Sequence, residues 1–179
     1  MLNRANWKDV AELIGIGAIV LSLIFVGFQI KQSHEIAMAA QYQARLDTWV
    51  GVLAAYIQSD VALRVVGERA RSSPLPVGID RVKWKKWHDE TPVEEIGFHH
   101  LSAVIDLRTA DNNYFQYQSG YLRQEAWLAF RAPLKQALSR DMSYVRLTYL
   151  RNKDQHRPAF RAEIERILAE IDGTSPPDE

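Results

Sequence analysis

The most apolar stretch of the chain runs from Val10 to Ile30, VAELIGIGAIVLSLIFVGFQI, and no residue between Leu13 and Phe28 is charged. Its 21 residues would form a helix about 31 Å long, because each helical residue adds about 1.5 Å. That length is close to the ~30 Å hydrocarbon thickness of a bilayer. The pattern therefore predicts one transmembrane helix at 10–30, preceded by a short flank at 1–9.

Polar and aromatic residues at both ends of the stretch support this interpretation. Trp7 and Lys8 precede it, and Gln29, Lys31 and Gln32 close it, as expected where lipid headgroups meet water. A helix buried in a soluble protein is one alternative, but the rest of the chain is too rich in charge to surround it. A cleaved signal peptide ending near 37–39 is another, but the apolar run exceeds the ~7–15 residues usual there.

One face of the predicted span carries small and polar side chains. At alternating steps of four and three residues stand Ala11, Gly15, Ala18, Ser22, Val26 and Gln29. Small residues allow two helix backbones to approach closely in lipid, and Ser or Gln side chains can add hydrogen bonds between helices. We expect this face to contact a second copy or a larger membrane protein. A homo-oligomeric channel lined by Ser22 and Gln29 is an alternative.

Beyond the span, apolar residues continue at helical spacing to Ile57 without a proline, so the helix is expected to extend into water. Periodicity, capping residues and Gly or Pro punctuation predict further helices at 59–70, 91–119, 123–139, 142–151 and 158–171. The start of the helix at 91 has the form of a capping box between Thr91 and Glu94, and Gly120 is placed to end it. The predicted fold class is all-α: a transmembrane helix continuing into a small helical bundle at 31–172, with 173–179 as a disordered tail.

The segment 80–90, DRVKWKKWHDE, combines two tryptophans with four basic residues. On a helix Trp84 and Trp87 share one face, which allows a contact with the membrane interface, where indoles and basic side chains are favoured. The preferred interpretation is an amphipathic helix whose tryptophans cover the core, because the segment is short for an interfacial helix. Binding of nucleic acid is the weakest alternative.

Polar groups on the helix expected at 91–119 suggest two further interpretations. Arg108 and Asn112 fall on its apolar stripe and are expected to find hydrogen-bond partners, as buried polar groups do. Glu95, His99 and Asp106 lie four and seven residues apart, so they share a face and could ligate a metal in a membrane-bound enzyme. We take that face to be solvated, and assign no catalytic, metal or cofactor residues.

Composition narrows the function further. The 179 residues include 22 basic and 22 acidic side chains, so the net charge of zero gives no reason to expect a nucleic-acid partner. Cysteine is absent, which excludes disulfides and thiolate chemistry. No phosphate-binding loop, nucleophile elbow or metalloprotease motif occurs.

The sequence resembles a group of small uncharacterised bacterial proteins over nearly its whole length. The resemblance is carried by SLIFVGFQIKQ at 22–32, DNNYFQYQSGYL at 111–122 with its Y-x-Q-Y-x-x-G pattern, and PAFRAEIERIL at 158–168. It implies one N-terminal span followed by a helical domain, and it implies no activity.

These observations lead to one expected function, a single-span membrane protein acting as an interaction or assembly module. The expected location is the bacterial inner membrane, with membrane lipid and a second copy or a larger membrane protein as partners. Basic residues within reach of the span are balanced on its two sides, so its orientation depends on the basic run at 81–86. That run favours a cytoplasmic C-terminal domain.

Overall fold

The computed structural model describes the backbone of residues 4–174 and the side chains of residues 7–174. Within these residues every regular element is a helix, which confirms the all-α prediction. The chain divides into two compact units, Met1–Tyr42 and Gln43–Glu179, and each is described by itself.

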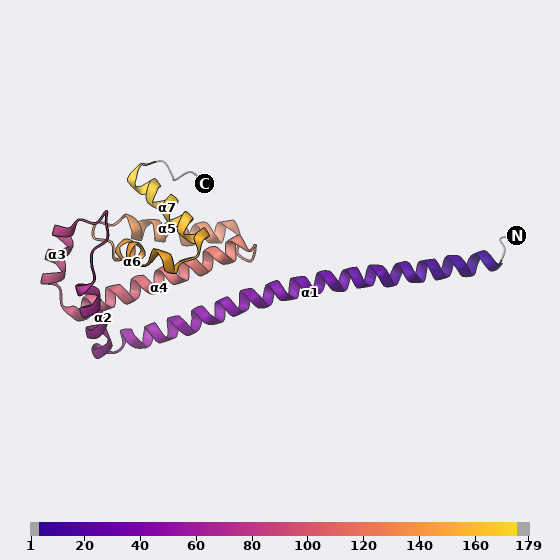
Figure 1. Ribbon diagram of the computed structural model, residues 1–179, viewed down its shortest axis with the longest axis horizontal. Coiled ribbons are helices and arrows are strands. Elements are labelled where there is room, and N and C mark those ends of the chain that lie inside the picture. Colours follow the sequence, from indigo (N-terminus) through magenta and orange to yellow (C-terminus); the bar gives the residue numbers. More distant parts are fainter. Residues whose placement is uncertain (1–3, 175–179) are drawn as a thin grey trace. The chain divides into compact units, whose positions relative to one another are not determined.

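The first unit consists of most of one long helix, α1 (Arg4–Ile57), which continues into the second unit. Figure 1 shows it as an unbroken ribbon, so the predicted extension of the apolar helix to Ile57 is confirmed. Its apolar side chains are exposed over the whole stretch 10–30, with Leu13 at 70% and Phe28 at 69% of full exposure. Among the described residues, one helix is thus long and apolar enough to cross a membrane.

The second unit is a bundle built around α4 (Val93–Gln118), against which α2, α5, α6 and α7 pack. Figure 1 shows α5, α6 and α7 on the same side of α4. The other elements are α2 (Asp60–Ser72), α3 (Arg81–Glu90), α5 (Gln124–Ser139), α6 (Tyr144–Asn152), a 3-10 turn (Lys153–Gln155) and α7 (Pro158–Asp172).

Most of the predicted helix boundaries hold to within about two residues. Gly120, at φ 78°, ends α4 as predicted, and Gly173, at φ 66°, ends α7. The disordered tail predicted at 173–179 falls largely outside the described residues, since 175–179 are not among them.

The core of this unit forms where α4, α5, α6 and α7 face one another. Ile96, Leu138, Leu147, Phe160 and Ile164 are fully buried there. Removing such side chains from water stabilises the fold by about 1.5–3 kcal/mol each. A second, smaller cluster joins Leu53 of α1, Leu63 of α2 and Leu101 of α4.

Helices α2 and α4 approach closely because each has a glycine at the crossing. A Cβ added to Gly67 would lie 1.8 Å from the carbonyl oxygen of Val93, and one added to Gly97 would lie 2.1 Å from that of Leu63. Neither position has room for a side chain. The two glycines therefore fix how closely α2 lies against α4.

The start of α4 differs from the predicted capping box. Pro92 precedes the helix, and no side chain caps it. The Glu94 carboxylate instead accepts a hydrogen bond from Arg64 Nε of α2 at 2.9 Å. The Glu94 side chain that the predicted capping box needed is thus paired with Arg64 of another helix.

The assignment of Trp84 and Trp87 to a membrane interface needs correction. Trp84 is only 3% exposed and packs edge-on against Tyr144 of α6, with ring centroids 5.1 Å apart. Trp87 is half-buried and contacts the same tyrosine at 5.4 Å. Burying an indole removes a large apolar surface from water, and both rings pack in or against the apolar core. This agrees with the preferred interpretation of 80–90, in which the tryptophans cover the core.

Candidate functional site: a pocket between four helices

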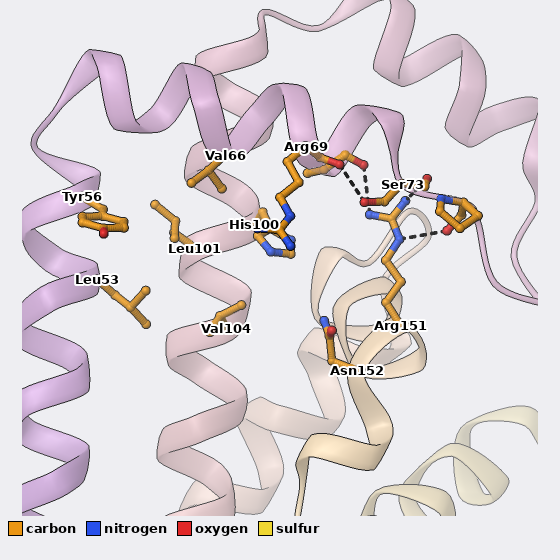
Figure 2. Close-up of a pocket in the computed structure, with 12 residues that line it drawn as sticks. Leu53, Tyr56, Val66, Arg69, Ser73, His100, Leu101, Val104, Arg151 and Asn152 are labelled. Atoms are coloured by element: carbon orange, nitrogen blue, oxygen red, sulfur yellow. Dashed lines mark hydrogen bonds between the residues drawn. The ribbon is translucent and has the colours of Figure 1, made fainter.

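A pocket of about 460 Å³ lies within the second unit, bounded by the end of α1, by α2, by α4 and by α6. Pockets that hold small organic ligands have volumes of about 300–1,000 Å³ and combine apolar walls with a few placed polar groups. Figure 2 shows the side chains that line it.

One half of the lining is apolar. Leu53 and Tyr56 come from α1, Val66 from α2, and Leu101 and Val104 from α4. In Figure 2 these side chains gather on one side of the pocket. They belong to, or adjoin, the smaller apolar cluster of the unit.

The other half is formed by the end of α2 and by Arg151 of α6. The Arg151 guanidinium donates hydrogen bonds to three carbonyl oxygens, from Nη1 to Ala70 at 3.1 Å, from Nη2 to Ser73 at 2.9 Å and from Nε to Pro74 at 3.2 Å. Carbonyls at a helix C-terminus lack partners within the helix. Arg151 thus completes the C-terminal end of α2 and fixes one wall of the pocket.

His100 of α4 stands between the two halves. Its Nδ1 atom is buried and has no hydrogen-bond partner among the described residues. Burial lowers the pKa of His100, and the charges of Arg151 and Arg69 lower it further. The imidazole is therefore neutral near pH 7.

Arg69 of α2 is exposed and reaches over the pocket toward His100 (Figure 2). The described residues 7–174 place no carboxylate within ion-pair distance of its guanidinium. Burial lowers the pKa of Arg151, which likewise has carbonyls rather than carboxylates as partners. The lining contains no Asp or Glu among the described residues, so the polar half carries uncompensated positive charge.

The residues predicted to make contacts in the membrane lie on α1. Ala11, Gly15, Ala18, Ser22 and Gln29 are all exposed, and a Cβ added to Gly15 would meet nothing within 4 Å. The Ser22 hydroxyl donates to the Ala18 carbonyl oxygen at 2.8 Å, so its proton is used within the helix. Trp7 and Lys8, which precede the N-terminal end of the predicted span, are also exposed.

The alternative metal set does not come together. Glu95 and His99 approach each other, with Oε1 and Nε2 3.7 Å apart on an exposed face. No group of three or more potential metal ligands is found in the part of the chain that the structure describes. Asp106 and His99 line one pocket together, and Glu95 is not part of its lining.

Arg108 and Asn112, the two polar residues predicted on the apolar stripe of α4, are hydrogen-bonded to residues of other elements. Arg108 donates to Gln155 beyond α6, and the buried Asn112 donates from Nδ2 to Gln43 Oε1 at 2.9 Å. The Oδ1 atom of Asn112 has no partner among the described residues. The polar layer is thus largely satisfied.

Two ion-pair groups were missed by the sequence interpretation. Asp111 is buried, with its Oδ1 3.5 Å from Arg157 Nη1 and its Oδ2 3.4 Å from His156 Nδ1. Glu163, 3% exposed, pairs with Arg131 and Arg166. Glu163 had one sequence signal: it falls between the apolar positions 160, 164 and 167 of an amphipathic helix. No local signal joins Arg69, His100 and Arg151, since they stand on three helices.

Comparisons with models of protein families, with curated proteins and with solved structures find no match to this chain.

Proposed function

We propose that the chain is a single-span membrane protein, in which α1 anchors the helical second unit to a bilayer. The supporting observation is the exposure of the apolar stretch of α1, which is not buried against any other described part of the chain. Each Å² of apolar surface left in water costs about 25 cal/mol. Lipid hydrocarbon removes that cost, and a helix satisfies its own backbone hydrogen bonds there.

The proposed location is the bacterial inner membrane, with the second unit on the cytoplasmic side. Exposed basic residues of α3, Arg81, Lys83, Lys85 and Lys86, support that side, because cytoplasmic segments carry an excess of Lys and Arg.

Alkaline carbonate extraction tests the span. We expect the wild-type chain to stay in the membrane pellet, and Ile19→Arg to reduce insertion by about 2.5–3.5 kcal/mol on translocon scales. Thr48→Arg is the matched control, since Thr48 is exposed on the same helix but outside the apolar stretch. Release of the intact wild-type chain by carbonate would refute the span.

We further propose that the span works as an assembly element, packing against a second copy through Ala11, Gly15, Ala18 and Ser22. In lipid, helices associate through close packing, which small side chains permit. Since the Ser22 hydroxyl is bonded to its own helix, close packing is favoured over a polar channel.

Cross-linking in membranes tests the assembly. Gly15→Leu/Ala18→Leu fills the proposed contact and keeps the span apolar, so we expect insertion to survive and cross-linked oligomers to decrease. Gly17→Leu/Gly27→Leu is the control, because a turn of about 100° per residue places these glycines on the opposite face. Equal oligomers in the wild type and the first variant would exclude this face as the contact.

A further inference from the structure

We propose that the pocket between α1, α2, α4 and α6 binds a small organic carboxylate with an apolar chain. The carboxylate would lie against Arg69 and Arg151, and the chain against Leu53, Val66 and Val104. This proposal is independent of the proposed membrane assembly.

The first argument is charge. Two guanidinium groups face a lining without a carboxylate. Arg151 is half-buried, and withdrawing a charge from water without a counter-ion is costly. Arg151 uses its three nitrogens on backbone carbonyls, which holds the group in place while leaving its positive charge unneutralised. Arg69 adds a planar fork of donors of the kind that binds a carboxylate with two parallel hydrogen bonds.

The second argument is the separation of the lining into halves. Apolar side chains occupy one side of the pocket in Figure 2 and the arginines the other, with His100 between them. A purely inorganic anion would leave the apolar half without a partner. A purely apolar ligand would leave the guanidinium charges unmatched.

The third argument is His100. Its buried Nδ1 atom lacks a partner in the described chain, and buried polar atoms are nearly always hydrogen-bonded. A carboxylate near Arg69 would bring an acceptor close to this ring. The pocket volume of about 460 Å³ accommodates a chain of several carbons in addition.

The experiment uses the full chain in nanodiscs of neutral lipid, with octanoate labelled by ¹³C at its carboxyl carbon. Carbon NMR of the label measures binding, and empty nanodiscs give the baseline for partition into lipid. We expect saturable binding of octanoate, weaker binding of acetate and octanol, and none of octylammonium. Failure to bind octanoate above the baseline, or equal binding of octanol, would overturn the proposal.

Variants then locate the ligand. Arg69→Gln should raise the dissociation constant by roughly tenfold or more, because a hydrogen bond to a charged group is lost. Val66→Phe should weaken octanoate binding by filling the apolar half, while acetate binding stays unchanged. Arg64→Gln is the control: it removes the same charge from α2, but Arg64 lies outside the pocket and pairs with Glu94. Circular dichroism checks that each variant is folded, and equal affinities for Arg69→Gln and Arg64→Gln would overturn the proposal.

Such a carboxylate can reach the pocket from water or, as a fatty acid, from the membrane. Oleate incorporated into the nanodiscs therefore competes against the labelled octanoate. Displacement at low oleate content assigns a membrane-derived fatty acid, and no displacement assigns a short-chain acid taken from water.

Discussion

Gly97 lacks a side chain, and the position of α2 depends on that. Because a Cβ there would lie 2.1 Å from a backbone oxygen, Gly97→Ala must move α2 away from α4. We expect a loss of on the order of 2 kcal/mol in the free energy of unfolding, as found for overpacked interiors. Denaturation followed by fluorescence measures it, since Trp84 and Trp127 are buried in this unit.

The control for this change is Gly51→Ala in α1. Gly51 lies inside a helix with nothing within 4 Å of an added Cβ, so alanine should stabilise by about 0.4–1 kcal/mol. An equal response of the two variants would show that the close crossing is not what constrains position 97.

Two histidines, the buried His88 and the half-buried His100, make stability depend on pH. Burial, helped by the charge of Arg151, lowers the pKa of both His88 and His100 below the ordinary 6.5. Below about pH 6.5 the unfolded chain therefore binds protons that the folded chain does not, and stability falls as the pH decreases. We expect a lower denaturation midpoint at about pH 5.5 than at about pH 7.5.

The pKa values of the acidic groups shift in different directions, since burial raises that of Asp106 above the ordinary 3.8. Hydrogen bonds from Arg131 and Lys135 lower the pKa of Glu170 to about 2, so its contribution is lost only as the pH falls below the ordinary 4.5. The double variant His88→Gln/His100→Gln should flatten the response between pH 7.5 and 5.5. An unchanged slope in that variant would assign the pH dependence to other groups.

At the scale of helices, the sequence patterns predicted what is decided locally. Periodicity located α1 to its end at Ile57, and Gly120 ends α4 as predicted. The sequence offered Ser59 or Asp60 as the cap of α2, and Ser59 is the one that accepts from the Ala62 amide. Each of these features depends on residues within about one helical turn. The capping box at the start of α4 was predicted wrongly, because the Glu94 side chain pairs with Arg64, 30 residues earlier in the chain.

The pocket could not be predicted in the same way. Its polar side chains, Arg69, His100 and Arg151, are up to 82 positions apart by their numbers (151 − 69), and none belongs to a motif. The packing of α2 on α4, set by two glycines, together with the packing of α6 on α4, brings them together. The general helical pattern was visible in the sequence, whereas the site depends on tertiary contacts.

For the whole molecule, the division at Tyr42 and Gln43 predicts separable behaviour. A fragment Gln43–Glu179 lacks the apolar stretch and keeps the core, so it should be soluble without detergent and unfold cooperatively. Sedimentation and circular dichroism measure this, with the full chain in the same buffer as the comparison. An aggregated or unfolded fragment would mean that the core requires the first unit.

The three hydrogen bonds of Arg151 also impose an order on biosynthesis. The carbonyls at the end of α2 receive them from a side chain 77–81 positions later. A ribosome adding about 5–20 residues per second needs roughly 4–16 s to make that interval. During those seconds α1 can form all of its backbone hydrogen bonds. The carbonyl groups at the end of α2, in contrast, stay without the three hydrogen bonds from Arg151 until α6 has left the exit tunnel.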